Sequence, residues 1–344
     1  MDELKTVIFR TDRIGDFIIS CPFILSYKKK YKDKKIVIIS SEYNFNYIKN
    51  FKFIDIIFPL KNEIKFLKKL FVLIKMIILL RQFNYSEIIV LDGKKRSFFI
   101  SLFLKGKKSI LLQSKGLEFL SKIFGYKSVI NYELQNQLKN FSFLASKLNF
   151  NIDMNKIDIY KNYDFDKTYN IDKKYILIHL DEKWFQKFYY KDFTDINPKI
   201  DELYKLIHNI GKINNYNHDI IITTGSKKLD IIDKIISDFK KVEKNIYCKK
   251  FNKIMVKLII NISFNELEFL VKNSSFLICC EGGISHVSNG FKVKTLAFYQ
   301  KNRLQHTKYW TGHMENLFLY ERKHINNIIS DPAFYKIIGN CIDN

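Results

Sequence analysis

The sequence has few of the residues that mark disordered, disulfide-linked or zinc-binding proteins. Only four prolines occur in 344 residues and 47% of the residues are apolar, which predicts a globular protein. The five cysteines show no Cys-x-x-Cys spacing, and two of them, Cys279 and Cys280, sit inside an apolar run. This usage favours a reducing compartment and argues against a zinc site.

Long uncharged segments are also missing. Residues 1–13, MDELKTVIFRTDR, include acidic side chains and no long apolar stretch, so no secretory signal is expected. Residues 64–83 are strongly apolar but contain no uncharged run longer than five residues, so they are not expected to span a membrane. We therefore expect a cytoplasmic protein.

Acidic residues are few relative to basic ones. The chain has 35 Asp and Glu against 58 Lys and Arg, a formal charge of +23, which favours an anionic partner such as an acidic membrane surface, a phosphorylated substrate or nucleic acid. Lysine greatly outnumbers arginine, as an AT-rich genome would give without selection for binding. Because the basic residues are scattered and form no recognised binding module, nucleic acid is not expected as a partner.

Strands and helices alternate along the chain. Apolar runs predict strands at 6–10, 35–40, 54–58, 87–91, 175–180, 219–223, 276–280 and 295–299, with helical patterns between most of them. Residues 149–173 are polar without a strong period, and we place a linker there. The pattern predicts an α/β fold of two Rossmann-like domains facing each other across a cleft, with boundaries at 1–160 and 161–344.

The most informative stretch is FLICCEGGISHVSNG, residues 276–290. An apolar run ends at Glu281, Gly282 and Gly283 and apolar spacing then resumes, as in a buried strand that turns sharply into a helix. Glycine lets backbone N–H groups approach a ligand, and the positive end of the helix favours an anion. His286 could face that anion, and Glu281 could accept hydrogen bonds from a sugar hydroxyl. Taken alone, the motif also fits a tight turn with an ordinary half-buried His286.

Residues 64–83 form a second informative segment. Lys65, Lys68, Lys69 and Lys75 fall on about a third of the helical circumference, and the rest is almost wholly apolar. We favour a core helix with one solvated stripe of lysines. The alternative is a basic amphipathic helix that rests on an anionic membrane.

Three segments resemble glycosyltransferase family 9, the bacterial lipopolysaccharide heptosyltransferases. VIFRTDRIGDFIISCPFILSYKKKY, from residue 7, is similar to the family's first signature, with an Arg after a strand and a Gly-Asp turn before a helix. FNYSEIIVLDGKKRS, from residue 83, is similar to its strand that ends in Asp. FNELEFLVKNSSFLICCEGGISHVSNGFKVKTLAFY, from residue 264, resembles its second signature. The resemblance runs in order from residue 6 to about 300.

The resemblance implies a GT-B fold, in which the first domain binds mainly the acceptor and the second mainly the nucleotide sugar. It also implies an inverting reaction without a metal or cofactor, with Asp16 as catalytic base. Such a displacement needs one carboxylate to take the acceptor proton and a cationic or dipolar site for the diphosphate. Asp16 is expected to stay ionised at its helix N-terminus, where capping without chemistry is the alternative. Arg13, Gly15 and Asp92 are acceptor-side candidates.

The donor-side candidates carried over from the family are Glu281, Gly282, Gly283, His286, Gly225 and a lysine near Trp184. Lys187 fits the family position of this lysine best, and Lys183 is its rival. The family usually has Asp where this chain has Glu281 and Ser or Thr where it has Gly282. Its acidic residue beyond Gly225 is replaced by lysine, and Asp230 could serve instead. These departures affect the expected identity of the nucleotide and of the sugar more than the expected fold.

These observations predict a heptosyltransferase-like enzyme at the inner face of the cytoplasmic membrane. It would move a heptose or similar sugar from a nucleotide-diphosphate donor to a lipopolysaccharide core or related glycolipid, and ADP-heptose is the expected donor. The alternative is a non-catalytic GT-B protein that binds a nucleotide or an anionic glycan.

Overall fold

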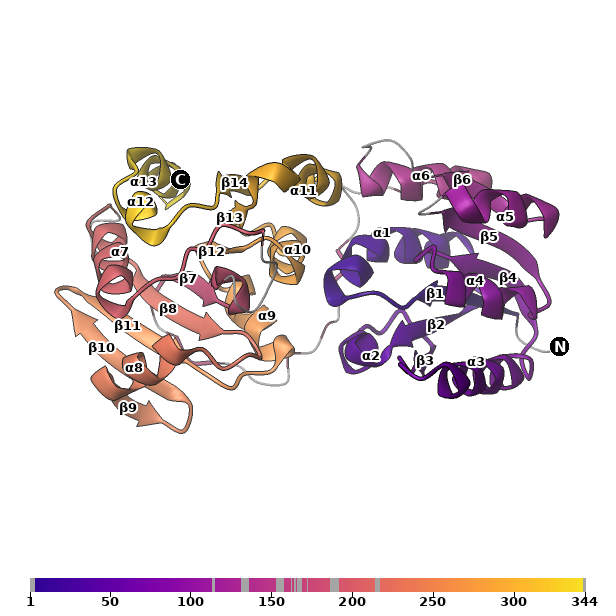
Figure 1. Cartoon of the computed structure of the whole chain (residues 1–344), viewed down its shortest axis with the longest axis horizontal. Helices are drawn as coiled ribbons and strands as arrows, with labels where there is room; N and C mark the ends of the chain where they lie inside the picture. The colour runs from indigo at the N-terminus through magenta and orange to yellow at the C-terminus, as the bar shows by residue number, and fades with distance from the viewer. Residues whose placement is uncertain are drawn as a thin grey trace. The chain divides into compact units, whose positions relative to one another are not determined.

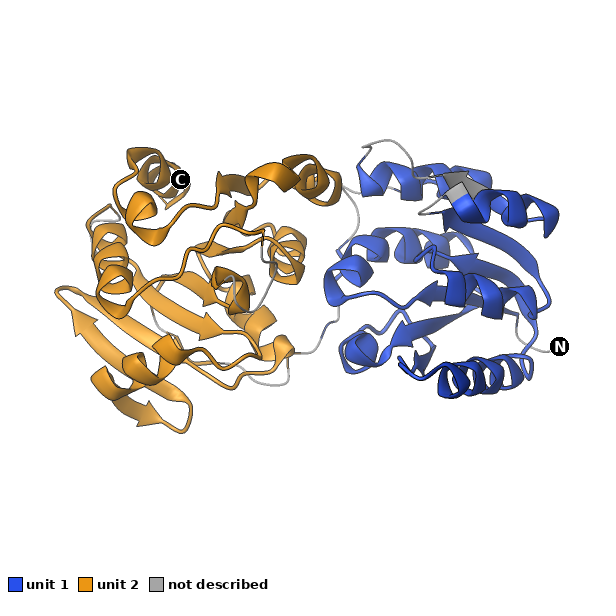
Figure 2. Cartoon of the chain, in the orientation of Figure 1, with its two compact units in different colours: residues 1–164 blue, residues 165–344 orange. Residues whose placement is uncertain are grey.

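The computed structural model describes residues 4–112, 115–130, 136–152, 158–161, 163, 165, 169–171, 173–185, 192–213 and 217–342. The chain forms two compact units, residues 1–164 and 165–344 (Figure 1 and Figure 2). Each unit is an α/β structure with its own sheet. The Lys187 position lies outside the described residues.

The first unit is built on a parallel sheet of six strands in the order β3-β2-β1-β4-β5-β6. Its strands are β1 Lys5–Arg10, β2 Lys35–Ser41, β3 Ile56–Leu60, β4 Tyr85–Val90, β5 Lys107–Leu112 and β6 Lys127–Ile130. Its helices are α1 Ile14–Lys30, α2 Glu42–Ile48, α3 Phe66–Leu80, α4 Lys95–Leu102, α5 Glu118–Ile123 and α6 Gln137–Lys147.

Helices cover both faces of this sheet. The chain moves from β1 to β3 in one direction and from β3 back to β4, β5 and β6 in the other. Because parallel connections are right-handed, α1 and α2 lie over one face and α3, α4 and α5 over the other. Burial on both sides explains why Val7, Ile8 and Phe9 of β1 form an uninterrupted apolar run that is fully buried.

The second unit is built on an eight-stranded sheet in the order β14-β13-β12-β7-β8-β11-β10-β9. Its strands are β7 Tyr175–Leu180, β8 Asp219–Thr224, β9 Lys240–Glu243, β10 Ile246–Phe251, β11 Ile254–Ile259, β12 Phe276–Cys280, β13 Thr295–Tyr299 and β14 Leu317–Glu321. Its helices are α7 Ile200–Ile213, α8 Asp230–Asp238, α9 Phe264–Lys272, α10 Gly283–Gly290, α11 Leu304–Thr311, α12 Ile325–Ile329 and α13 Pro332–Ile342.

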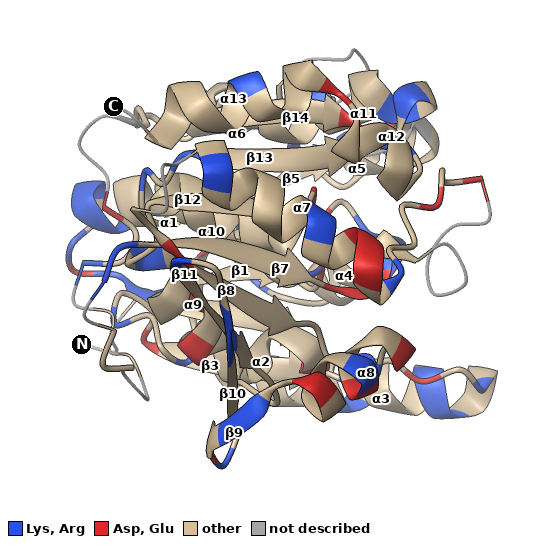
Figure 3. Ribbon diagram, turned by 90° about the vertical axis from the view of Figure 1, so that its left-hand side faces the viewer, with Lys and Arg blue, Asp and Glu red and all other residues tan. Residues whose placement is uncertain are grey.

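One end of this second sheet is antiparallel. β10 runs antiparallel to both β9 and β11, whereas the remaining pairs are parallel. The edge strand β9 is exposed along its length and carries Lys240 and Lys241, which Figure 3 shows in blue. Charged side chains on an exposed edge oppose pairing with another chain.

A capping box fixes the start of α9. The Ser263 side chain accepts a hydrogen bond from the Glu266 N–H at 3.1 Å, and the Glu266 carboxylate accepts one from the Ser263 N–H at 2.7 Å. Other elements were not predicted, among them α2, α4, β5, β9, β10 and β14. The last strand predicted from the sequence is the one at 295–299, but the structure has a further strand, β14, after it.

The helix α3 differs from the expected core helix. Only Met76, Ile77 and Leu80 are buried in it, and much of its apolar surface faces outward together with its lysines. None of the helices in the described part of the chain has the length and hydropathy needed to cross a membrane.

Candidate functional site

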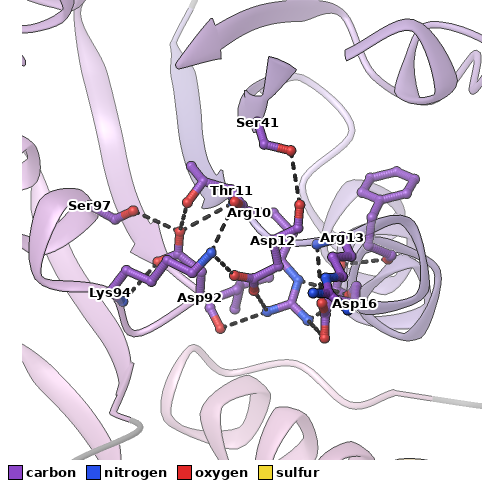
Figure 4. A network of polar contacts seen from close by, with 12 residues as sticks. Arg10, Thr11, Asp12, Arg13, Asp16, Ser41, Asp92, Lys94 and Ser97 are labelled. Carbon is purple, nitrogen blue, oxygen red and sulfur yellow. Dashed lines mark hydrogen bonds and ion pairs between the residues drawn. The ribbon is translucent and has the colours of Figure 1, made fainter. Parts of the chain in front are cut away.

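The carboxyl ends of β1 and β4 carry a cluster of charged side chains (Figure 4). Arg10 ends β1 and is fully buried. Its Nη1 donates to the Leu91 carbonyl at 3.0 Å, and its Nε and Nη2 donate to the Asp16 carbonyl at 2.8 and 2.6 Å. It also pairs with the Asp12 carboxylate at 3.0 Å. A buried guanidinium needs such partners, and here they fix the loop between β1 and α1.

Asp92 anchors the same loop from the end of β4. It is fully buried and accepts hydrogen bonds from the Thr11 N–H at 3.2 Å, the Thr11 hydroxyl at 2.6 Å, the Ser97 hydroxyl at 2.7 Å and the Lys94 N–H at 3.1 Å. Burial and the charge of Asp12 raise the pKa of the Asp92 carboxyl. With its oxygens bonded inside the protein, Asp92 holds the loop that leads to Asp16.

Four further contacts hold the loop from other directions. The Ser41 hydroxyl and the Asn44 amide donate to the Asp12 carbonyl at 2.9 and 2.7 Å. The Lys94 ammonium donates to the Thr11 carbonyl at 3.0 Å and pairs with the Asp12 carboxylate. Groups from the ends of three neighbouring strands thus fix the backbone that leads into α1.

Asp16 is the third residue of α1. Its Oδ2 accepts a hydrogen bond from the Arg13 N–H at 3.1 Å, so it does cap the helix. Its side chain is 24% exposed, against 10% for Asp12 and none for Asp92, which makes it the most accessible carboxylate of the three. Burial raises the pKa of Asp16, while the nearby Arg10 guanidinium opposes that rise. An accessible carboxylate with a raised pKa is suited to accept a proton.

The other two residues expected near Asp16 occupy different environments. Arg13 is exposed and precedes α1, where its side chain can meet a ligand. Gly15 is buried in the first helical turn and contributes only backbone.

The turn between β12 and α10 is shaped by a lysine from another strand end. The Lys183 ammonium donates to the Glu281 carbonyl at 2.8 Å. Gly282 has φ 153°, and a Cβ atom there would lie 2.0 Å from the Lys183 Nζ. Glycine is therefore required both for the backbone and for the position of the ammonium group. The Ser285 hydroxyl closes the turn by donating to the Gly282 carbonyl at 2.7 Å.

Lys183 is held at this turn by buried neighbours. It lies in the 3₁₀ turn Glu182–Trp184 after β7, where the Asp181 carboxylate accepts its N–H at 3.1 Å. Trp184 is fully buried, packs on Phe298 and donates its indole N–H to the His179 carbonyl at 3.0 Å. Burial raises the pKa of Asp181, and the Lys183 charge opposes that rise. A packed indole next to Lys183 in the chain limits the positions that this lysine can reach.

Arg322 is a site-supporting residue that sequence reasoning missed. It is buried, and its guanidinium donates to the Lys183 carbonyl, to the Cys280 sulfur at 3.1 Å and to the Thr194 carbonyl at 3.0 Å. It thereby ties the end of β14 to the loop after β7 and to the end of β12. The available signal was the charged pair Glu321 and Arg322 after the apolar residues of β14, a strand that was not predicted.

His286 lies in the first turn of α10, as expected, but is buried. Its ring stacks near that of His313, with 6.4 Å between ring centroids. Burial lowers the pKa of His313 to about 4, so that ring is neutral at physiological pH. Glu281 and Gly283 are partly exposed at the same turn.

A pocket of about 280 Å³ opens at the end of β8. Its lining combines polar groups at Thr224–Lys228 and Asn261 with apolar side chains that include Ile232 and Ile260. Asp233 lines this pocket and pairs with Lys228 at 2.9 Å. The expected substitute, Asp230, instead lines a separate pocket of about 190 Å³.

Gly225 links this pocket to the Lys183 loop. A Cβ atom at Gly225 would lie 2.8 Å from the Glu182 carboxylate and 3.1 Å from the Asp181 Cβ. The donor-side candidates within the described residues therefore gather at the carboxyl ends of β7, β8 and β12, and the acceptor-side candidates gather at those of β1 and β4. The part of the chain that the structure describes contains no group of three or more His, Cys, Asp or Glu side chains that could hold a metal ion.

Comparisons with known proteins agree with this architecture. The family model "Glycosyltransferase family 9 (heptosyltransferase)" matches residues 73–331. The structure is similar to Escherichia coli heptosyltransferase WaaC, solved with ADP-2-deoxy-2-fluoro heptose, at 13% identity and a TM-score of 0.70 over 99% of both chains. No curated protein sequence matches the chain significantly.

Two more solved structures have a similar fold. Escherichia coli ADP-heptose lipopolysaccharide heptosyltransferase II aligns at 9% identity and a TM-score of 0.65, over 98% of both chains. The family 9 glycosyltransferase of Veillonella parvula aligns at 12% identity and a TM-score of 0.63, over 93% of this chain and 86% of that one. The α/β fold of the GT-B class predicted from the sequence is confirmed.

Proposed function

The chain belongs to glycosyltransferase family 9, the heptosyltransferases, and from that premise we propose that it transfers a heptose-type sugar from ADP-heptose to a lipopolysaccharide core or related glycolipid. The proposed reaction inverts the anomeric centre and needs no metal. Support for the donor comes from the similarity to WaaC, which was solved with ADP and with an ADP-heptose analogue.

The observation that carries the proposal is the environment of Asp16. Its carboxylate is partly exposed on a loop that Arg10, Asp92 and Lys94 hold in place, and burial raises its pKa. A positioned base with a raised pKa takes a proton from an acceptor hydroxyl more readily than one with an ordinary pKa. We assign Asp16 as the catalytic base and Asp92 as a positioning residue.

The donor site that we propose lies in the second unit. The Lys183 ammonium and the amino end of α10 at Gly282 and Gly283 supply positive charge and dipole for the diphosphate. The pocket beside Gly225 offers apolar side chains and polar groups that suit a nucleoside. Asp233 is placed to meet a ribose hydroxyl there if its pair with Lys228 opens.

In the proposed reaction the acceptor oxygen forms a bond to the anomeric carbon as its proton passes to Asp16. The bond between that carbon and the diphosphate oxygen breaks, and its electron pair leaves on ADP. Attack opposite to the leaving group inverts the configuration. Lys183 and the dipole of α10 stabilise the negative charge that grows on the diphosphate.

Asp16→Asn tests the assignment of the base. With ADP-heptose and a deacylated lipopolysaccharide core, we expect kcat to fall about 10²- to 10⁴-fold while ADP affinity by calorimetry is unchanged. Glu266→Gln is the matched control, because Glu266 occupies the same capping position on α9 and should keep its turnover. Turnover close to wild type in Asp16→Asn would remove Asp16 from this role.

A nucleotide panel tests the donor. Thermal unfolding is measured with ADP, GDP, UDP and CMP and with their sugar conjugates, including ADP-heptose. ADP and ADP-heptose should stabilise the protein, by about 2.7 kcal/mol at a hundredfold excess over Kd. A shift with another nucleotide would change the donor and keep the family. A shift with ADP but no turnover by the wild-type protein would favour the non-catalytic binder.

A further inference from the structure

An outward-facing apolar stripe runs along α3. It comprises Leu67, Leu70, Phe71, Ile74 and Ile78, which are 77%, 39%, 57%, 45% and 59% exposed. These positions follow the spacing i, i+3, i+4, i+7 and i+11, so they share one side of the helix. The opposite side is anchored in the core by Met76, Ile77 and Leu80. The outer side of a helix in a protein of this size is normally polar, so this stripe needs an explanation.

The neighbouring helices extend this apolar surface. α4 exposes Phe99 and Phe103, whose rings pack together at 5.1 Å between centroids. α5 exposes Phe119, Leu120 and Ile123. The three helices lie over the same face of the first sheet, with α3 in contact with α4 and Phe98 of α4 packed near Phe124 (Figure 1). We call the outer side of this helix layer the α3–α5 surface.

The charges on α3 and α4 are all of one sign, whereas α5 carries Glu118, which pairs with Lys122 at 2.8 Å. The sequence contains no Asp or Glu from residue 64 to 86 or from residue 93 to 117, although both segments contain several Lys and Arg residues. On α3, Lys68 and Lys75 are exposed beside the apolar stripe, and Lys75 lies 4.4 Å from the centre of the Phe71 ring. Long lysine side chains beside buried apolar groups can extend their ammonium groups to a polar boundary.

From this combination we propose that the α3–α5 surface docks on an anionic lipid bilayer. Apolar side chains on a helix that lies flat enter the boundary between head groups and acyl chains, while the lysines meet the negative head groups. This explains why apolar and basic groups occur together on α3 and α4 and why acidic ones are missing from these two helices. The inference goes beyond the proposed function and does not depend on it, since lipid binding needs neither donor nor turnover.

Charge argues against the two other occupants of such a surface. A symmetric dimer through this surface would place the basic sides of α3 and α4 against those of a second copy, while Glu118 of α5 is already paired with Lys122. Like charges oppose such contact. Nucleic acid would use the lysines, but it would leave the aliphatic stripe of α3 exposed to water. An anionic bilayer would contact both the lysines and the aliphatic stripe.

Vesicle flotation of the full chain tests the proposal. We expect binding to vesicles of phosphatidylcholine and phosphatidylglycerol, and at least about tenfold weaker binding to phosphatidylcholine alone. The triple variant Leu67→Ser, Phe71→Ser, Ile74→Ser should lose about tenfold or more of the binding to the mixed vesicles. The double variant Lys68→Glu, Lys75→Glu should bind more weakly and lose most of its dependence on phosphatidylglycerol.

Matched controls come from the other face of the same unit. Tyr43 on α2 and Phe143 on α6 are 81% and 54% exposed, and Tyr43→Ser with Phe143→Ser should bind as the wild type does. Circular dichroism melting confirms that each variant is folded, and these exposed substitutions are expected to leave the fold intact.

Three results would overturn the proposal. These are no binding to phosphatidylglycerol vesicles by the wild type, equal loss in the Tyr43 and Phe143 control, or undiminished binding by the folded triple variant. Sedimentation velocity in lipid-free buffer adds a separate outcome: a dimer that the triple variant abolishes, without vesicle binding, would assign the surface to a second copy.

Discussion

At the scale of single residues, Lys183 connects the chemistry of the donor site to its geometry. Its ammonium is placed at the Gly282 turn by a hydrogen bond to the Glu281 carbonyl, and its backbone is held by Arg322. A hydrogen bond from the Lys183 ammonium to the diphosphate would be a strong, charged one. Its loss in Lys183→Met should therefore weaken ADP binding about 10- to 100-fold. Calorimetric titration with ADP measures this effect.

Two other lysines complete that measurement. Lys205→Met is the control, because Lys205 is exposed on α7 and away from the turn. Lys187→Met decides between the two family candidates: a loss in Lys187→Met with normal binding in Lys183→Met would reverse our assignment.

The acid limb of the pH–rate profile depends on the charges around Asp16. Asp16 must be deprotonated to accept a proton, so kcat/KM should fall as the pH drops through its pKa, which burial raises above the ordinary value. The Lys94 charge lowers that pKa, because it favours the ionised carboxylate. Lys94→Met should therefore raise the pKa of Asp16 further and move the acid limb to higher pH.

Lys95→Met controls for the general loss of a positive charge. Lys95 is the next residue and is exposed at the start of α4. Its replacement should leave the acid limb in place. An unchanged limb in a folded Lys94→Met enzyme would mean that a group other than Asp16 controls the profile.

At the scale of secondary-structure elements, the β12–α10 turn depends on one glycine. Gly282→Ala places a side chain where Lys183 now lies and imposes a backbone conformation that only glycine adopts readily. We expect a loss of about 1–3 kcal/mol in the free energy of unfolding, together with weaker ADP binding. Denaturant melts and calorimetry measure the two effects.

Gly116→Ala is the matched control for that change. Among the described residues, and apart from the two chain neighbours of Gly116, no atom lies within 4 Å of a Cβ atom built there, and its φ is not in the left-handed region. This variant should unfold within about 0.5 kcal/mol of the wild type. If Gly282→Ala had the same stability and ADP affinity as Gly116→Ala, the β12–α10 turn would not be what holds Lys183.

Patterns in the sequence identified some elements and missed others for physical reasons. The apolar runs of β1, β7 and β12 predicted strands because both faces of these strands are buried. The strand β9 was missed because it lies at the exposed edge, where lysines replace apolar residues. Its neighbour β10 was missed because it is only partly buried and also carries lysines. For α3, periodicity grouped the residues on a common side but did not show which side the core would cover.

The candidate site was predicted to a similar extent. Asp16 and Gly282 stand at turns that follow buried strands, so their local sequence carried the signal. Arg322 and Asn44 act through contacts between segments far apart in the chain, and no local pattern specifies those contacts. Positioning groups of this kind require the three-dimensional structure.

At the scale of the whole molecule, the division into two units with separate sheets gives the last prediction. If the second unit alone supplies the nucleotide site, ADP will stabilise segments of that unit against local opening and leave the first unit unaffected. We expect slower hydrogen exchange in residues 181–185, 224–229 and 282–286 at saturating ADP. Residues 1–164 should exchange at an unchanged rate, apart from any general effect that CMP, as a control nucleotide, also produces. Protection by ADP confined to the β1–α1 loop would instead assign nucleotide binding to the first unit and contradict the proposed roles of Lys183 and Gly282.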